Sequence, residues 1–142
     1  MSDGLTHGGV RTSVGIDLVR ISRIAESLEL FGAKFLERVY TEAEVAYAMA
    51  SPELTAERLA ARFAAKEATV KALDFKDTGV GWRDIEVARR PSGACELVLH
   101  GAALTVARER GVEDLSVSLS HEGDYATAVV LATCHRQGDK TT

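Results

Sequence analysis

Residues 62–73 read RFAAKEATVKAL, and this stretch decides the fold because it predicts a long central helix. It is rich in Ala, also carries Lys, Glu and Leu, and contains neither Gly nor Pro, which is typical of helices. On a helical wheel, Phe63 and Val70 share one face with Glu67, so that face is apolar except for one carboxylate.

The position of Glu67 allows two interpretations. A carboxylate on a core-facing stripe is destabilising unless a charged group meets it. Lys71 lies one turn further on, but an i,i+4 ion pair contributes only about 0.3–0.5 kcal/mol. The simpler interpretation is a salt-bridged helix face in solvent. The apolar neighbours of Glu67 instead favour a carboxylate that is retained for function.

On the N-terminal side of this helix, residues 12–19 predict a strand. Its apolar side chains alternate onto one face, and they are Val14, Ile16 and Leu18. Asp17 projects from the other face, although Asp is depleted in strands. It either caps the helix that follows or binds a ligand, and the two roles do not exclude each other.

Shorter helices are predicted between that strand and the central helix. Residues 20–30 form an amphipathic helix in which Arg20 and Arg23 point away from the apolar stripe. These arginines are either an ordinary solvated face or a contact for an acidic partner. A short turn or helix is predicted over 34–40. A helix is predicted over 41–49, where Thr41 begins a capping box, and the central helix runs from Pro52 to Leu73.

The second half of the chain is rich in predicted strands. Gly79 lies in a loop over 74–81, where two glycines alone are a weak signal for phosphate binding. His121 falls at the tip of a predicted hairpin, where a lone His is usually solvated. Strands are predicted over 85–88, 96–99, 115–119 and 125–132, and a helix over 101–110. Because helices segregate from antiparallel strands, the predicted fold class is α+β, a single domain with an antiparallel sheet and a long central helix.

Length and composition favour one cytoplasmic domain. The chain has 142 residues, 46% of them hydrophobic, and a net charge of -4 that disfavours a nucleic-acid-binding protein. No stretch approaches the ~20 apolar residues of a membrane span. Cys95 and Cys134 lack metal-ligand spacing. We expect flexible ends over 1–11 and 134–142 around a domain over 12–133.

Asp17, Glu67 and His121 are therefore the polar positions that stand out. Two carboxylates with oxygen-only chemistry suit Mg²⁺, which keeps several waters and often bridges to substrate phosphates. Asp17 and Glu67 are therefore the candidate ligands for such an ion, and His121 is the least certain of the three positions.

Four blocks of the sequence resemble, in the same order, the signatures of the holo-(acyl carrier protein) synthases, which are small phosphopantetheinyl transferases. The blocks are GIDLV at 15–19 with Arg23-Ile24, RFAAKEATVKAL at 62–73, WRDIEV at 82–87 and SLSH at 118–121. They span nearly the whole chain. Two features depart from the family pattern: the loop over 74–81 is lengthened, and Gly93-Ala94-Cys95 replaces the usual Gly-x-Pro.

The resemblance implies an enzyme that transfers the phosphopantetheine arm of coenzyme A to a serine of an apo acyl carrier protein, with release of adenosine 3′,5′-bisphosphate. It implies that Asp17 and Glu67 bind Mg²⁺ and that Lys71 adds a positive charge beside the phosphates. The base that removes the serine proton is either Glu67 or a metal-bound water positioned by Asp17. Whether the carrier serves fatty-acid or polyketide biosynthesis is left open.

The same resemblance assigns binding roles. It implies that His121, Arg62 and Gly79 contact the coenzyme, and that Arg20 and Arg23 dock the acidic carrier protein. It also implies a homotrimer with active sites between subunits.

Two other classes remain as alternatives. A non-catalytic module that binds coenzyme A or a carrier protein would not need the pair of Asp17 and Glu67. Another Mg²⁺-dependent phosphate enzyme, such as a nucleotide hydrolase, would release phosphate without any carrier protein.

Overall fold

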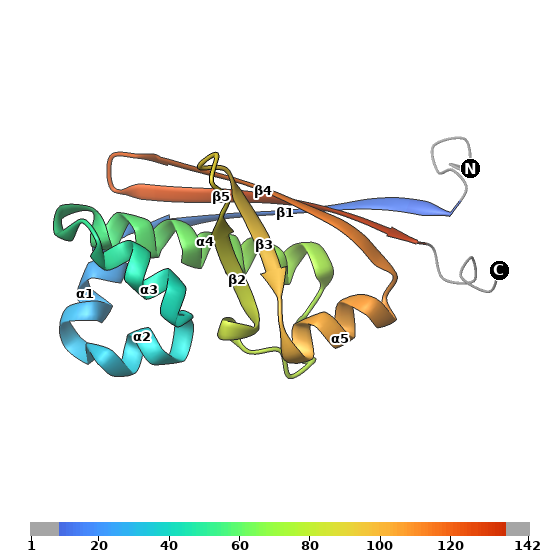
Figure 1. Ribbon diagram of the computed structural model, residues 1–142, viewed down its shortest axis with the longest axis horizontal. Coiled ribbons are helices and arrows are strands. Elements are labelled where there is room, and N and C mark those ends of the chain that lie inside the picture. The colour runs from blue at the N-terminus through green and yellow to red at the C-terminus, as the bar shows by residue number, and fades with distance from the viewer. Residues whose placement is uncertain (1–8, 136–142) are drawn as a thin grey trace.

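The computed structural model describes residues 9–135, and Figure 1 shows its arrangement. Strands β1 (Val10–Arg20) and β5 (Tyr125–His135) pair antiparallel over their full lengths, and Val10 lies opposite His135. Residues 10–11 and 134–135 are therefore strand residues, which corrects the expected flexible ends at 1–11 and 134–142. The rest of those two segments lies outside the described residues, except for Gly9.

The predicted single sheet is two sheets. Strand β4 (Val112–Glu122) completes a three-stranded antiparallel sheet in the order β1-β5-β4. Strands β2 (Ile85–Arg89) and β3 (Cys95–Leu99) form a separate two-stranded sheet. The inner face of β5 buries only small or branched side chains: Ala126, Ala128, Val130 and Ala132. Small side chains let the central helix pack close to this strand, and the α+β class is confirmed.

The central helix α4 (Thr55–Leu73) begins after a 3-10 turn over Pro52–Leu54, slightly later than predicted. Strand β1 passes so close to it that a Cβ on Gly15 would lie 2.0 Å from the Ala68 carbonyl oxygen and 2.8 Å from the Ala72 nitrogen. Only glycine fits at this crossing. The close approach brings Asp17, two residues along β1, beside α4.

The helical wheel predicted the wrong buried face for α4. Phe63, Glu67 and Val70 are only half-buried, whereas Arg62 and Lys66 are buried. Because other elements cover α4 on most sides, its least buried side is the one that carries Glu67. The prediction assumed one core face, and a helix enclosed by several elements does not have one.

A buried ion pair joins α4 to its neighbours. Lys66 Nζ lies 2.9 Å from Glu44 Oε1, and both side chains are fully buried. Glu44 also accepts hydrogen bonds from the backbone nitrogens of Thr41 (2.9 Å) and Val87 (2.7 Å), and Lys66 donates to the Trp82 carbonyl (3.0 Å). The pair therefore ties β2 and the turn before it to α4.

Helices α1 (Ile21–Phe31) and α3 (Glu42–Met49) pack on α4, and α2 (Ala33–Val39) packs on α1. Helix α5 (Gly101–Glu109) comes later in the chain and packs on β4 and on the 3-10 turn over Trp82–Asp84. The capping box predicted at Thr41 is confirmed, with Glu44 as its acid. Among residues 9–135, none of the helices is both long enough and apolar enough to cross a membrane.

Asp17 does not cap α1, which corrects one of its two predicted roles. The N-cap residue is Arg20, which makes no side-chain cap bond. Asp124, in the turn between β4 and β5, accepts hydrogen bonds from the first amides of α1 instead. Its carboxylate accepts from the Ser22 nitrogen (2.9 Å), and its carbonyl accepts from the Ile21 nitrogen (2.8 Å). Two free amides at the helix start are thereby satisfied.

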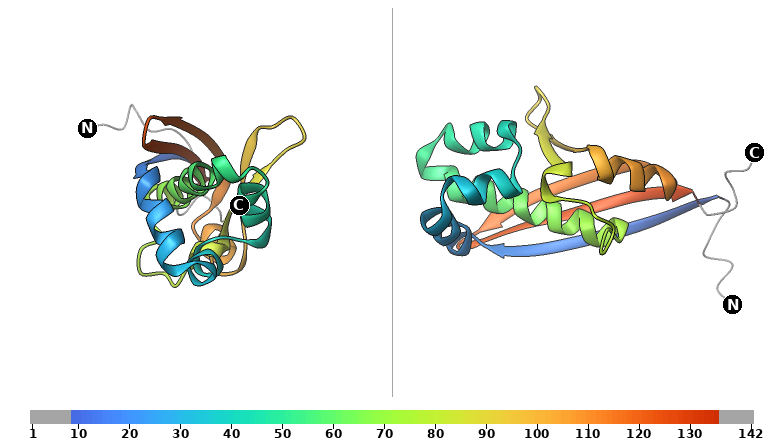
Figure 2. Two further views of the ribbon diagram at one scale, coloured as in Figure 1. Left: turned by 90° about the vertical axis from the view of Figure 1, so that its left-hand side faces the viewer. Right: turned by 90° about the horizontal axis from the view of Figure 1, so that it is seen from below.

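The outer face of the three-stranded sheet is apolar along β1. No helix covers this face among residues 9–135, because the helices lie together on the other side (Figures 1 and 2). The exposed row on β1 is Val10, Val14, Ile16 and Leu18, each between 48% and 63% exposed, and Leu131 on β5 is 43% exposed. The predicted alternation is confirmed, with the apolar side chains facing outward.

Candidate functional site

Asp17 and Glu67 line one cavity of about 470 Å³ between β1, α1 and α4. Asp17 reaches it because Gly15 sets β1 against α4, and Glu67 reaches it from the least buried side of α4. Arg20 and Arg23 line the same cavity at the start of α1. The structure therefore brings together four of the residues predicted from the sequence.

The charges in this cavity are coupled. Burial raises the pKa of Glu67 above its ordinary value, the Asp17 carboxylate raises it further, and Lys71 opposes both. Lys71 pairs with Asp17 rather than with Glu67, because its Nζ lies 3.0 Å from Asp17 Oδ1 and donates to the Ile16 carbonyl at 3.0 Å. Asp17 is 16% exposed and Lys71 55% exposed, so the ammonium group has room to move.

This cavity has the donor chemistry of a site for a hard divalent cation. The Asp17 carboxylate disfavours the charge of Glu67, and a cation bound by both would remove that repulsion. Within residues 9–135, no group of three or more His, Cys, Asp or Glu side chains is placed to bind a metal. Two protein carboxylates with water or phosphate oxygens are the usual environment of Mg²⁺.

Arg62 and His121 lie in a different cavity, of about 330 Å³. His121 Nε2 lies 3.2 Å from Glu57 Oε2. Arg62 is only 3% exposed, its guanidinium lies 4.4 Å from the centre of the Tyr47 ring, and its Nε has no hydrogen-bond partner. Burial lowers the pKa of Arg62 from its ordinary value. Within one chain, Arg62 and His121 thus share a cavity that is separate from the cavity of Asp17 and Glu67.

The sequence analysis did not single out two further arginines of this second cavity. Arg58 and Arg89 also lie over the Tyr47 ring, 4.1 and 4.8 Å from its centre. Arg58 Nη1 donates to the Tyr47 carbonyl and Arg89 Nη1 to the Tyr47 hydroxyl, both at 2.8 Å. Arg58 could have been found, since it lies one turn before Arg62 on the same helix. Arg89 carried no local signal, because it comes from β2.

Gly79 lines neither of these cavities. It has a left-handed φ of 82°, and no atom lies within 4 Å of a Cβ built on it. Its loop is anchored instead by Phe75, which is 3% exposed. The backbone conformation explains the glycine, and the contact with the coenzyme stays a prediction.

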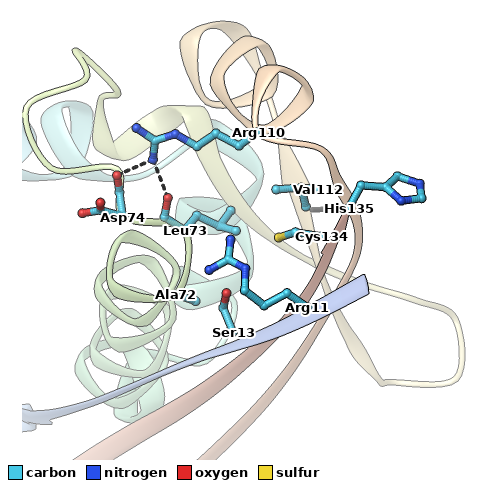
Figure 3. A pocket seen from close by; sticks show the side chains of 9 residues that line it. All are labelled: Arg11, Ser13, Ala72, Leu73, Asp74, Arg110, Val112, Cys134 and His135. Carbon is cyan, nitrogen blue, oxygen red and sulfur yellow. Dashed lines mark hydrogen bonds between the residues drawn. The ribbon is translucent and has the colours of Figure 1, made fainter. Parts of the chain in front are cut away.

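A third cavity, of about 640 Å³, lies at the far end of α4 (Figure 3). Arg110 Nη1 donates to the carbonyls of Leu73 and Asp74, where α4 ends. A cation on the last carbonyls stabilises a helix end. Arg11 also lines this cavity, and none of the predicted site residues does.

Comparison with known proteins gives the class. A family model described as "4′-phosphopantetheinyl transferase superfamily" matches residues 13–130. The chain thus belongs to the phosphopantetheinyl transferase superfamily.

Relatives narrow this class. The chain is 50% identical over 117 residues to a holo-[acyl-carrier-protein] synthase of Gloeobacter violaceus, covering 82% of this chain and 89% of the relative. It is 46% identical to that of Koribacter versatilis, covering 82% and 94%. The chain belongs to the holo-[acyl-carrier-protein] synthase family.

Solved structures with a similar fold belong to the same family. A structure described as a Chronobacterium ammoniagenes ACPS-CoA complex superposes with a TM-score of 0.78 at 36% identity, covering 89% of this chain and 99% of that one. The Helicobacter pylori holo-[acyl-carrier-protein] synthase in complex with coenzyme A gives a TM-score of 0.73 at 31% identity, covering 84% and 98%.

Proposed function

We propose that this chain transfers the phosphopantetheine arm of coenzyme A to a serine of an apo acyl carrier protein, with Mg²⁺ bound by Asp17 and Glu67. One observation carries the metal assignment: two carboxylates from separate elements share a cavity, and Asp17 contributes to the raised pKa of Glu67. The names of the relatives, and the coenzyme A in two similar structures, support the substrates.

The reaction forms a bond between the serine oxygen and the phosphorus of the arm, and breaks the bond from that phosphorus to adenosine 3′,5′-bisphosphate. When bound, Mg²⁺ would neutralise charge on the transferring and leaving phosphates. Lys71 would add a second positive charge there, since its exposed ammonium group can leave Asp17 for a phosphate oxygen.

The serine proton needs an acceptor. Glu67 is one candidate, because a raised pKa makes its carboxylate a better base near neutral pH than an ordinary glutamate. The other candidate is a water held by Asp17. Glu67→Gln removes the first acceptor while retaining the shape of the side chain.

The coenzyme contacts proposed for His121 and Arg62 require a second copy of the chain. Their cavity and the carboxylate cavity are separate in one copy, so a neighbour would supply the missing half. The exposed apolar row on β1 supports this arrangement, since a large uncovered apolar face favours self-association. The proposed assembly is a homotrimer.

Sedimentation velocity tests the assembly directly. We expect a trimer, and Ile16→Glu, on the exposed row, should dissociate it and abolish transfer. Thr105→Glu, at an exposed position of α5 away from this row, is the matched charge control. An active monomer would contradict the shared site.

The remaining assignments concern the carrier protein, Gly79 and the compartment. Arg20 and Arg23 flank the carboxylates and are proposed to dock an acidic carrier protein. Gly79 receives no defined contact. The proposed compartment is the cytoplasm, in keeping with two free cysteines.

Intact-mass analysis tests the function. An apo carrier protein incubated with this chain, coenzyme A and Mg²⁺ should gain the mass of one phosphopantetheine arm. Glu67→Gln should abolish the gain, whereas Glu53→Gln, an exposed acid outside both cavities, should not. Binding without a mass gain would indicate a non-catalytic module, and phosphate release without carrier would indicate a hydrolase.

A further inference from the structure

Cys95 opens onto the cavity that holds Arg62. It is the first residue of β3, it is half-buried, and its thiol is free. The other cysteine, Cys134, is only 2% exposed. The chain therefore presents two thiols of the same kind in contrasting surroundings.

The surroundings of Cys95 are electropositive. Arg58, Arg62 and Arg89 line the cavity and gather on the Tyr47 ring. Among the lining residues within 9–135, Glu57 is the one acid, and it lies beside His121. The lining thus carries an excess of positive charge.

Arg62 adds an independent sign that this cavity takes a ligand. Arg62 is only 3% exposed, yet its Nε has no hydrogen-bond partner. A buried donor without a partner is destabilising, and an anionic acceptor in the cavity would satisfy it. Negative charge on a small reagent that enters the cavity is favoured for the same reason.

Such surroundings distinguish reactive thiols from inert ones. Reactive cysteines are partly exposed and lie beside cations, whereas structural cysteines are buried. In thiol–disulfide exchange, a thiolate attacks one sulfur of a disulfide and displaces the other. A cavity lined by one sign of charge also concentrates reagents of the opposite sign.

We propose that Cys95 is a modification site whose thiol exchanges with small anionic disulfides drawn into the arginine-lined cavity. The Cys95 proton passes to water, Sγ forms a new S–S bond with one reagent sulfur, and the reagent S–S bond breaks. The second sulfur leaves as a thiolate. The disulfide is itself the oxidant, so no other co-reactant is needed.

The adduct would occupy a cavity of about 330 Å³ beside Arg62 and His121. This consequence rests on the proposed function, which assigns those two residues to the coenzyme. Modified protein should therefore lose transfer activity, and a thiol reductant should restore it.

The reactivity test compares two disulfide reagents on the native protein. One is dianionic, 5,5′-dithiobis(2-nitrobenzoate), and the other is neutral, 4,4′-dithiodipyridine. With each rate divided by that of free cysteine, the anionic reagent should be preferred on the order of tenfold. Inorganic phosphate should abolish the preference. Cys95→Ser should remove the fast reaction and leave the slow one of Cys134.

A charge variant supplies the control for mechanism. Arg89→Gln should lower the rate with the anionic reagent while leaving the rate with the neutral reagent nearly unchanged. Equal normalised rates for both reagents, or peptide mapping that places the label on Cys134, would overturn the proposal.

The activity test separates this proposal from the function itself. Transfer by the labelled wild type should fall and recover with dithiothreitol, whereas Cys95→Ser should transfer equally before and after the same treatment. Full labelling of Cys95 without loss of transfer would refute the blocking of the cavity. Absence of transfer before any treatment would count against the proposed function, and the labelling rates would still decide the reactivity of Cys95.

Discussion

At the scale of single residues, Glu67 carries a pKa raised by burial and by Asp17, while Lys71 pairs with Asp17. A carboxyl group with a raised pKa in the folded protein disfavours the fold once it is ionised. The charge of Glu67 thus lowers the stability of the metal-free protein at neutral pH, and it would raise the affinity of the site for a cation.

Glu67→Gln should therefore separate stability from function. We expect divalent-cation affinity to fall by roughly 100-fold, the upper range for perturbed metal sites. Thermal unfolding of the metal-free variant at neutral pH should be unchanged or raised, because the repulsion with Asp17 is gone. Calorimetric titration with Mg²⁺ and thermal melts measure the two effects. A variant with lower melting temperature and unchanged affinity would show a structural role instead.

Cation binding should depend on pH in a defined direction. The folded protein holds a proton on Glu67 up to a higher pH than an ordinary glutamate does, and a cation must displace that proton. Mg²⁺ affinity should accordingly fall on acidification, starting above the range in which ordinary carboxylates titrate. Titrations over a pH series test this. If affinity declines only where unperturbed carboxylates protonate, the coupling of Glu67 to Asp17 is absent.

At this scale the sequence predicted the carboxylate pair but not its surroundings. Asp17 and Glu67 were recognisable as polar residues in apolar contexts. The partner of Lys71 was not, because Asp17 is distant in sequence, and Lys66 gave no sign that it is buried with Glu44. Ion pairs between distant elements leave no local pattern.

At the scale of elements, the crossing of β1 and α4 sets the geometry of the carboxylate cavity. Gly15→Ala should be severely disruptive, since its Cβ would lie 2.0 Å from a backbone oxygen of α4. Overpacking of this kind destabilises by about 1–3 kcal/mol or more. Gly81→Ala is the control, because its Cβ would meet only Asp84 Oδ2 at 3.8 Å. Urea denaturation of both variants tests this, and equal midpoints would disprove the close crossing.

Local signals predicted most of the elements. The capping box at Thr41, the hairpin of β4 and β5 and the helix over α1 were found where patterns of a few residues specify them. The division into two sheets and the enclosure of α4 were not, since both depend on contacts between distant segments.

At the scale of the whole molecule, the proposed function brings the carrier protein to the carboxylate cavity past α1, where Arg20 and Arg23 line it. Arg23→Glu should raise the KM for an acidic carrier about tenfold while changing the KM for coenzyme A little, because charge at an interface rim mainly affects encounter. Arg108→Glu, exposed on α5 and outside both cavities, is the matched control. Steady-state kinetics with each substrate varied in turn decide the point, and parallel changes in both constants would exclude this docking face.

The order of the four sequence blocks was enough to indicate the family, and the blocks at 15–24, 62–73 and 118–121 also carry residues of the proposed site. Their distribution over two cavities was not visible in the sequence. In one chain, His121 and Glu67 line separate cavities, and only the three-dimensional structure reveals that separation.

The hairpin tip has a mechanical consequence. Asp124 accepts hydrogen bonds from the Ser22 and Ile21 amides, so the tip of the β4–β5 hairpin is joined to the start of α1. A ribbon lengthened by a pair of residues would carry its tip past the helix start and release it. The contact of Asp124 therefore constrains the length of the β4–β5 hairpin, and insertions should be tolerated better in other parts of the chain.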